Sequence, residues 1–221
     1  MHAAYGAYAH GGAHFLAWHR LLLLGFENAL RTVDAAVTLP FWDWALDAAD
    51  PALSPVWGPT MLGGTVAGGC INDGAFAGWA VDNNGTHCIM RGFTSGQAGA
   101  LGSLFLPKAA LSAFWSNTSA PWADFASGLE VVHGLPHVEI GHRRLQGDMY
   151  RLERAAADPA FFAHHTFVDA VWAARQGVPG IDRRAYGGAI GGGRTAALGD
   201  VLEPFGVRAA AAVDLDCVVY E

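Results

Sequence analysis

Ten of the 221 residues are histidine, and most of them lie in two groups far apart in the chain. In chain order, the grouped residues are His2, His10, His14 and His19, then His133, His137, His164 and His165. Imidazole nitrogen suits zinc, copper, iron and nickel as a ligand. The second group contains no thiolate and few carboxylates, which favours copper or zinc. The pattern therefore predicts metal binding.

The second group has the spacing of two ligands on one helix. His133 and His137 are four residues apart, so on a helix their rings project from one face about one turn apart. His165 lies in a separate, strongly apolar segment, where an imidazole without a partner would be costly to bury. We therefore expect these three rings to hold one metal ion.

Three histidines near the start of the chain repeat this logic. His10 and His19 are nine residues apart, and His2 lies eight residues before His10, so the three rings can converge beside the helix that carries His19. Two such groups on paired helices indicate two metal ions inside a helical bundle. Three neutral imidazoles leave an open position on each ion, and an adjacent pair could bind a small bridging ligand such as dioxygen.

The other histidines have simpler interpretations. A residue beside a terminus is often disordered, which is the alternative interpretation of His2. His14 and His164 each lie beside a better candidate, so we expect them to pack against or support the ligands. His87 and His142 show no partner pattern and are expected at the surface.

Helices must position these rings, and the apolar pattern predicts where they run. Residues 14–33 are apolar on nearly every face, which is typical of a helix covered by its neighbours. Residues 158–175 begin with Asp158 and Pro159, an N-cap followed by proline at the first helical position. Both segments are therefore expected to be helices that carry ligands.

Weaker patterns predict helices over 108–114 and 122–138, with a kink or break at Pro136. Glycine, proline, asparagine and aspartate punctuate residues 47–107, where we expect a long loop-rich insertion. The tail from residue 177 is expected to form a loop and a short terminal strand. The predicted fold is thus mainly α: a four-helix bundle core that holds a dinuclear site, with long irregular loops and a few short strands.

Length and composition narrow the class of protein. The chain is long enough for a full hydrophobic core, and we expect one domain over residues 1–221. No apolar run approaches the roughly 18 residues of a membrane-spanning helix. A net charge of −7 and the lack of a basic stripe argue against nucleic acid as a partner. Because Met1 directly precedes a candidate ligand, we expect a chain truncated at its N-terminus.

Three features bear on the compartment. Cys70 and Cys88 flank a glycine- and asparagine-rich stretch that a disulfide could close. Asn84 and Asn117 begin Asn-X-Ser/Thr tripeptides in turn-rich segments that could accept a glycan. Together they favour a secreted or lumenal glycoprotein with a disulfide.

Four segments carry a resemblance to a known family. They read HGGAHFLAWHR at 10–20, LPFWDW at 39–44, LEVVHGLPH at 129–137 and DPAFFAHHTFVDAVW at 158–172. In this order they resemble the two copper-binding regions of the tyrosinase family, which includes tyrosinases, catechol oxidases and molluscan haemocyanin units. The resemblance spans residues 2–176.

The resemblance implies a type 3 site with two copper ions. It assigns to the first copper His2, His10 and His19, and to the second His133, His137 and His165. It also implies residues that support the ligands from outside, namely His164, Phe161, Arg20 and Asp169. The implied activity is oxidation of o-diphenols to o-quinones with dioxygen, with hydroxylation of monophenols as a further option.

The chain departs from the family pattern at several positions. Tyr8 stands where many members have a cysteine that is crosslinked to the second ligand. Gly134 follows His133, where several monophenol-hydroxylating members have an asparagine that helps to orient a water. Glu130 is the candidate acid for that water, and Tyr220 is what remains of a terminal Tyr-X-Tyr motif. The missing asparagine at position 134 favours diphenol oxidation.

Two alternatives use the same six ligands. A haemocyanin-like protein would carry dioxygen reversibly in a covered pocket. A zinc-loaded relative would have little redox activity, since zinc favours the same imidazoles. The expected partners are small phenols and dioxygen, and the oligomeric state stays open.

Overall fold

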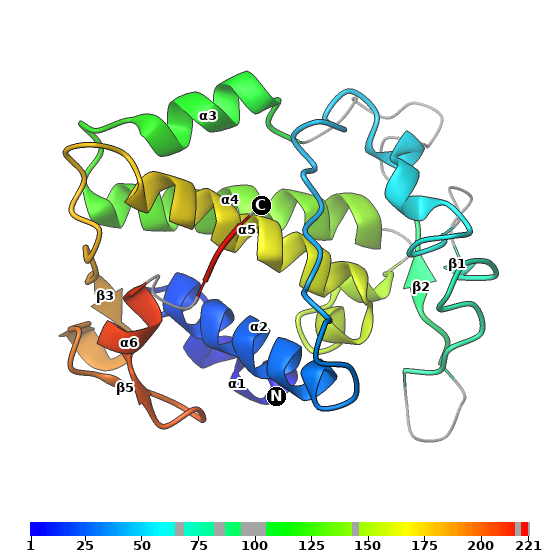
Figure 1. Ribbon diagram of the computed structural model, residues 1–221, viewed down its shortest axis with the longest axis horizontal. Coiled ribbons are helices and arrows are strands. Elements are labelled where there is room, and N and C mark those ends of the chain that lie inside the picture. Colours follow the sequence, from blue (N-terminus) through cyan, green and yellow to red (C-terminus); the bar gives the residue numbers. More distant parts are fainter. Residues whose placement is uncertain (65–68, 82–86, 94–104, 143–145, 215–217, 221) are drawn as a thin grey trace. The chain divides into compact units, whose positions relative to one another are not determined.

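The computed structural model describes residues 1–64, 69–81, 87–93, 105–142, 146–214 and 218–220 (Figure 1). The described chain forms two compact units that interleave along the sequence. One unit contains residues 1–4, 42–111 and 132–164, and the other contains residues 5–41, 112–131 and 165–221. Four helices pass from one unit into the other: α1 (His2–Ala9), α3 (Lys108–Ser116), α4 (Trp122–Gly141) and α5 (Ala160–Gln176).

Helix α2 (Phe15–Arg31) confirms the apolar helix expected near the start of the chain. Phe15, Trp18, His19 and Leu23 are among its buried residues. Its last turn ends at Thr32, whose hydroxyl donates to the carbonyl of Ala29 at 2.7 Å. The helix therefore carries its histidine on a covered face.

Helix α5 begins as the sequence predicts. A carboxylate oxygen of Asp158 accepts a hydrogen bond from the backbone N–H of Ala160 at 2.9 Å, which satisfies a free donor of the first turn. The same carboxylate pairs with Arg91, and both side chains are fully buried. Arg91 also donates to the carbonyl of Gly63, so the start of α5 is anchored to the irregular segment before it.

Helix α4 does not break at Pro136 but continues to Gly141. Proline has no N–H to offer the carbonyl four residues earlier, so the helix forgoes one bond of its ladder there. The turns on both sides carry buried side chains, among them Leu129 and Ile140. Packing of these side chains holds the helix together across the proline.

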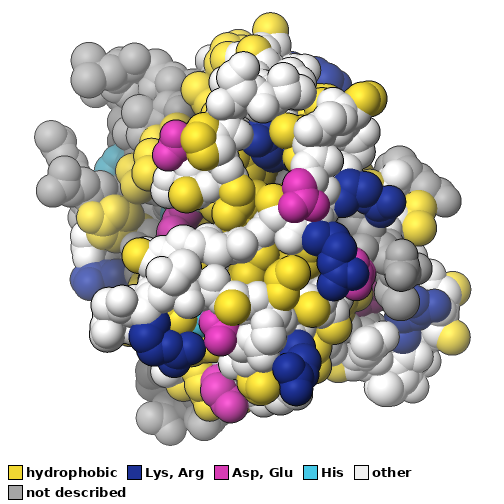
Figure 2. Space-filling model, turned by 90° about the vertical axis from the view of Figure 1, so that its left-hand side faces the viewer, with side chains coloured by type: hydrophobic (Ala, Val, Ile, Leu, Met, Phe, Trp, Pro, Cys, Tyr) yellow, Lys and Arg dark blue, Asp and Glu magenta, His cyan; other side chains and the backbone are white. Residues whose placement is uncertain are grey.

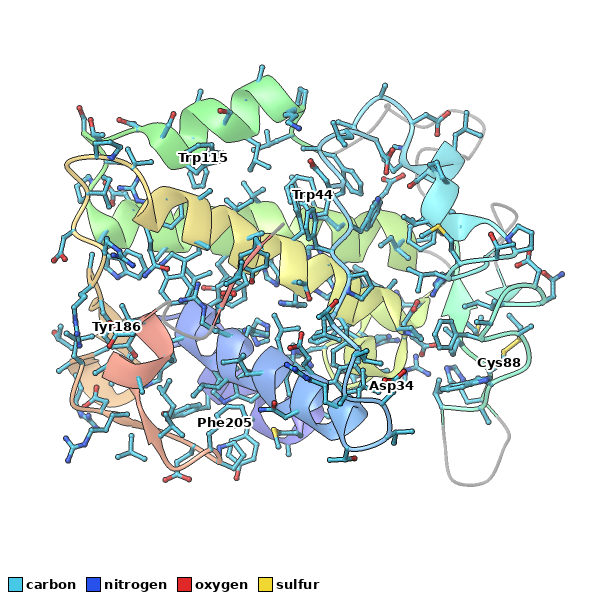
Figure 3. The ribbon with its side chains drawn as sticks, viewed as in Figure 1. Asp34, Trp44, Cys88, Trp115, Tyr186 and Phe205 are labelled. Carbon is cyan, nitrogen blue, oxygen red and sulfur yellow. A yellow bond between two sulfur atoms is a disulfide. The ribbon has the colours of Figure 1, made fainter. Side chains whose placement is uncertain are left out.

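The insertion over 47–107 is mostly irregular in its described residues. It contains two single 3₁₀ turns (Pro51–Leu53 and Pro55–Trp57) and the antiparallel pair β1 (Gly69–Cys70) and β2 (Met90–Arg91). A disulfide joins Cys70 and Cys88, which confirms the predicted bridge and appears as the yellow bond at Cys88 in Figure 3. Asn84 lies outside the described residues.

The segment after α4 adds two further 3₁₀ turns, Asp148–Tyr150 and Ala155–Ala157. The tail begins with the antiparallel pair β3 (Ala189–Ile190) and β4 (Arg194–Thr195), which a short turn at Gly191–Gly193 connects. It continues with the antiparallel pair β5 (Val201–Leu202) and β6 (Val207–Arg208).

The expected terminal strand is wrong for the described residues. Residues 209–213 form helix α6 (Ala209–Val213), and 218–220 form no strand. Ala209, Ala212 and Val213 of this helix are buried. The strand was expected in the Leu/Val-rich residues 213–221, of which 215–217 and 221 lie outside the described residues. Cys217 lies outside the described residues.

The fold is therefore mainly α with short strands, as the sequence predicts. None of the helices in the described ranges is long and apolar enough to cross a membrane. On the face drawn in Figure 2, basic and acidic side chains are interspersed with apolar ones.

Candidate metal centre

The structure brings the three histidines of the first predicted group together. His2 lies at the start of α1, His10 directly follows that helix, and His19 lies on α2. Each offers a ring nitrogen, and these atoms lie within 4.8 Å of one another. His2 and His19 are buried, whereas His10 is half-buried and borders a cleft of about 450 Å³.

The second predicted group converges in the same way. His133 and His137 lie one turn apart on α4, with ring centroids 5.2 Å apart, and His165 comes from α5. Their ligand nitrogens also lie within 4.8 Å of one another. This group again has two buried rings, with His137 half-buried. Of the neighbours His164 and His165, it is His165 that completes the group.

Backbone carbonyl groups set the tautomer of four of these rings. The Nδ1 atoms of His10 and His19 donate to the carbonyls of Gly6 at 2.9 Å and Phe15 at 2.8 Å. Nδ1 of His2 donates to the carbonyl of Leu152 at 3.0 Å, and Nδ1 of His137 donates to the carbonyl of Met149 at 2.8 Å. A carbonyl oxygen only accepts, so each Nδ1 carries the proton and the lone pair of the neutral ring is on Nε2. This is the arrangement that a metal-binding histidine needs.

Two sets of ring contacts show that the groups are adjacent. His19 of the first group stacks on His165 of the second, with centroids 4.4 Å apart and planes 7° from parallel. Phe161 contacts His2 edge to face at 4.8 Å and His137 at 6.1 Å. Phe161 therefore packs against a ring of each group, as the resemblance implied. A donor set of three imidazoles in each of two neighbouring groups fits two copper ions.

His164 packs against the second group. Its ring is 5.8 Å from His133, nearly parallel, and 4.9 Å from His137, edge to face. The ring of Trp44, which is labelled in Figure 3, has its centroid 6.5 Å from that of His164. The fully buried His164 ring thus restricts where both neighbouring rings can turn.

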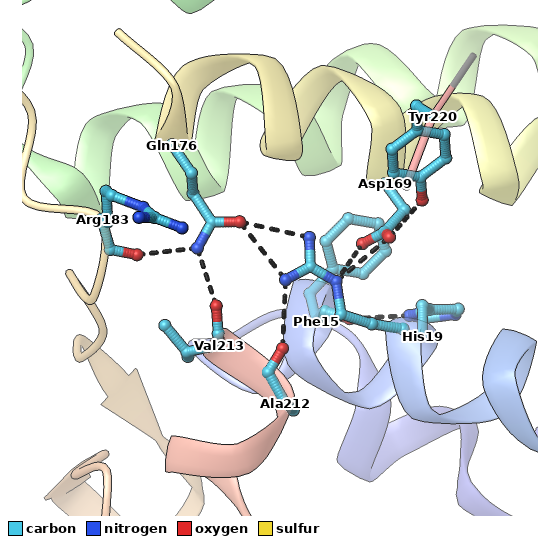
Figure 4. A network of polar contacts seen from close by, with 9 residues as sticks. Phe15, His19, Asp169, Gln176, Arg183, Ala212, Val213 and Tyr220 are labelled. Atoms are coloured by element: carbon cyan, nitrogen blue, oxygen red, sulfur yellow. Dashed lines mark hydrogen bonds and ion pairs between the residues drawn. The ribbon is translucent and has the colours of Figure 1, made fainter. Parts of the chain in front are cut away.

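A buried ion pair between Arg20 and Asp169 joins α2 to α5 (Figure 4). The Nε atom of Arg20 donates to both carboxylate oxygens of Asp169, at 2.8 and 3.1 Å. Its guanidinium lies 3.6 Å over the ring of Trp172 and also donates to Gln176. Because Arg20 follows His19, this pair holds the helix that carries the stacked ring of the first group.

The C-terminal segment contributes to the same network. Tyr220 donates its hydroxyl to Asp169, and burial together with that carboxylate raises the pKa of the tyrosine. The amide nitrogen of Gln176 donates to the carbonyls of Arg183 and Val213 (Figure 4). Sequence reasoning placed Arg20 and Asp169 but gave Gln176 no role, because two of its partners are backbone carbonyl groups, which leave no pattern of their own.

Glu130 lies one turn before His133 on α4. A carboxylate oxygen accepts a hydrogen bond from the backbone N–H of Gly11 at 2.6 Å. Burial raises the pKa of Glu130, and the Gly11 hydrogen bond acts in the opposite direction. The role of Glu130 in orienting a water stays a prediction.

The expectation of surface positions for the two remaining histidines is wrong. His142 is buried at the end of α4 with a positive φ of 46°. His87 is half-buried, and its Nε2 lies 2.8 Å from a carboxylate oxygen of the fully buried Asp148. His87 has no sequence pattern, because its partner Asp148 comes from a distant short turn.

His14 belongs to neither group of three histidines. Its Nδ1 lies 2.8 Å from the hydroxyl of Tyr186, and its ring lies 4.7 Å from that of Tyr8. Burial lowers the pKa of His14, with Asp200 raising it and Arg194 lowering it. Burial also lowers the pKa of His10, against the effect of its bond to Gly6, and so favours the neutral ring that binds metal.

Comparison with known proteins gives three kinds of match. The model of the family described as "common central domain of tyrosinase" matches residues 1–177. A tyrosinase from Streptomyces antibioticus is 33% identical over 183 residues, covering 74% of this chain and 63% of that protein. A tyrosinase-like protein from Diaporthe leptostromiformis is 34% identical over 200 residues, covering 77% of this chain and 50% of its own length. The chain thus spans less than two thirds of these relatives.

Solved structures show the same likeness. A polyphenol oxidase variant from Thermothelomyces thermophila superposes with a TM-score of 0.63 at 25% identity, covering 79% of this chain and 57% of that one. A mushroom tyrosinase superposes with a TM-score of 0.57 at 18% identity, covering 93% of this chain and 69% of that one, which is a likeness of fold.

Proposed function

Because the chain belongs to the tyrosinase family, we propose that it is a type 3 copper oxidoreductase that converts o-diphenols to o-quinones with dioxygen. The observation that carries the proposal is the contact between two groups of three imidazoles through the stacked rings of His19 and His165. The proposed ligands are His2, His10 and His19 for one ion, and His133, His137 and His165 for the other. We also propose that residues 1–221 form a single catalytic domain.

The protein's own contribution is orientation and exclusion of water. When bound, a copper pair supplies the two-electron exchange between a phenol and dioxygen. Backbone carbonyl groups accept from Nδ1 of His2, His10, His19 and His137, which keeps Nε2 of each ring as the ligand atom. Two rings of each group are buried, so the protein shields the ions from bulk solvent on those sides.

Diphenol oxidation is the finer activity that we propose. Hydroxylation of a monophenol needs an added base at the site to deprotonate the phenol. Gly134 has no side chain to hold a water beside His133, and a carboxylate oxygen of Glu130 is already engaged by Gly11. Both features favour a substrate that carries two hydroxyl groups.

The test uses copper-loaded protein in an oxygen electrode, with catechol and a monophenol measured side by side. We expect two copper ions per chain, oxygen consumption with quinone formation from catechol, and slower turnover of the monophenol. The His137→Ala variant should bind one copper and lose the activity. Stoichiometric oxygen binding without quinone would indicate a carrier, and failure to bind a second copper would refute the dinuclear site.

We also infer a secreted or lumenal location. The Cys70–Cys88 disulfide supports it, because such bonds persist in oxidising compartments. Asn117 is exposed, so a glycan at its tripeptide would meet no steric barrier from the core. Mass spectrometry of the protein from its native source would detect the glycan and the bridge. A reduced, unmodified chain would contradict this location.

A further inference from the structure

We propose that Glu130 is a positioning residue for the first metal group, because its carboxylate holds the loop that carries His10 against helix α4. The hydrogen bond from Gly11 to Glu130 is the observation behind this proposal. The inference rests on the proposed assignment of His10 as a ligand. It gives Glu130 a task that does not depend on contact with substrate.

The loop over residues 10–14 starts at the end of α1. The carbonyl of Gly6 accepts both the backbone N–H of His10 at 3.1 Å and its ring Nδ1 at 2.9 Å. The ring is therefore turned back onto the last turn of α1. The next residue, Gly11, has φ 71°, a left-handed conformation that glycine adopts without strain, and its N–H donates to Glu130.

Strand β3 holds the same loop from a different part of the chain. The N–H of Ala13 donates to the carbonyl of Ala189 at 3.1 Å. That carbonyl oxygen would lie 2.8 Å from a Cβ atom at Gly12, so the two backbones meet where only glycine fits. Glu130 is an anchor of this loop that a side-chain substitution can remove without changing a proposed ligand.

The position of Glu130 links the two metal groups. The residue lies three positions before His133, on the helix that carries two ligands of the second group. Because a helix is stiff over one turn, the contact with Gly11 sets where His10 sits relative to that helix. Loss of an outer partner of a ligand typically weakens metal binding by about 10- to 100-fold.

Two substitutions of Glu130 separate its hydrogen bond with Gly11 from other roles of the side chain. Glu130→Ala removes the acceptor, whereas Glu130→Gln keeps a carbonyl oxygen that the Gly11 N–H can reach. Asp124→Ala is the matched control, because Asp124 is an exposed carboxylate on the same helix. Each change is made in two backgrounds. His137→Ala leaves the first group complete, and His10→Ala leaves the second group complete.

The measurement is copper affinity, from competition with a chromophoric chelator, together with thermal unfolding of the metal-free protein. In the His137→Ala background, we expect Glu130→Ala to weaken copper binding about 10- to 100-fold. Glu130→Gln should restore most of that affinity, and Asp124→Ala should leave it unchanged. In the His10→Ala background, Glu130→Ala should leave copper binding unchanged.

Three results would overturn the proposal: unchanged affinity in the His137→Ala background, an equal loss in both backgrounds, or no rescue by glutamine. An equal loss would indicate general destabilisation, which the unfolding temperature would also report. These outcomes differ from failure of the proposed function, which would appear in the unmodified protein as fewer than two bound copper ions or no quinone.

Discussion

At the scale of single residues, a charged pair buried beside the metal groups decides how firmly two helices are joined. Arg20 and Asp169 are both nearly inaccessible to solvent, and each neutralises the charge of the other. Removal of one member leaves a charge in the interior without its counterion, which typically destabilises a protein by about 3–5 kcal/mol. The hydroxyl of Tyr220 adds a further donor to Asp169.

The Asp169→Ala substitution should therefore lower the free energy of unfolding by about 3–5 kcal/mol. Urea denaturation of the metal-free protein measures it. Glu153→Ala is the control, because Glu153 is exposed and a surface change of this kind usually stays within about 0.5 kcal/mol. Equal effects of the two substitutions would show that the ion pair does not join α2 to α5.

His14 makes the stability depend on pH. Burial lowers the pKa of its folded-state imidazole, so between this value and the ordinary value of 6.5 the unfolded chain binds more protons than the folded one. Stability must then rise with pH through this window and fall as the pH drops through it. We expect metal-free protein to be less stable towards urea at pH 5 than at pH 7. The difference should be smaller for His14→Gln, and an unchanged difference would contradict this role.

The sequence predicted the six converging histidines but not the groups that orient them. These histidines leave a pattern because two of them share a helix face and His19 and His165 lie in apolar segments. Their acceptors, such as the carbonyls of Leu152 and Met149, belong to backbone that any residue type provides. His87 was missed for the same reason, since Asp148 lies in an irregular segment that no periodicity places.

At the scale of elements, glycines on α4 differ in what surrounds them. A Cβ atom at Gly134 would meet nothing within 4 Å, whereas one at Gly128 would lie 3.0 Å from the ring of Phe114. Glycine inside a helix is less favourable than alanine by about 0.5–1 kcal/mol. The two positions therefore separate helix propensity from packing.

Gly134→Ala should raise the free energy of unfolding by about 0.5–1 kcal/mol. Gly128→Ala should raise the free energy of unfolding by less than this, or lower it, because the ring of Phe114 must shift to admit the methyl group. Chemical denaturation of both variants in the metal-free state makes the comparison. The same gain at both positions would mean that Phe114 yields without cost.

Helix ends with a chemical signal were predictable, and those fixed by packing were not. The start of α5 carries Asp158 and Pro159, and the structure places the cap there. The continuation of α4 through Pro136 depends on buried neighbours elsewhere in the chain, which a local pattern does not contain.

At the scale of the whole molecule, a disulfide stabilises the irregular insertion. The disulfide closes 18 residues of sequence between Cys70 and Cys88 in a segment with little regular structure. A crosslink over a loop of this size restricts the unfolded chain and is worth about 3 kcal/mol in the loop-entropy model. Strand β2, which follows Cys88, carries Arg91, and Arg91 forms an ion pair with Asp158 at the start of α5.

Replacement of both Cys70 and Cys88 by serine should lower the free energy of unfolding by about 3 kcal/mol. Urea denaturation with and without a reductant is the measurement. Reductant should destabilise the parent protein to a similar degree and leave the double variant unchanged. A parent protein indifferent to reductant would show that the bridge does not constrain this segment.

One short stretch of backbone serves both metal groups. The carbonyl of Leu152 orients His2 and that of Met149 orients His137, and these two acceptors are three positions apart. Occupation of either group would steady this stretch and so prepare the acceptor that the other group requires. Uptake of the two ions should then be cooperative, and half-loaded molecules should be scarce when copper is limiting.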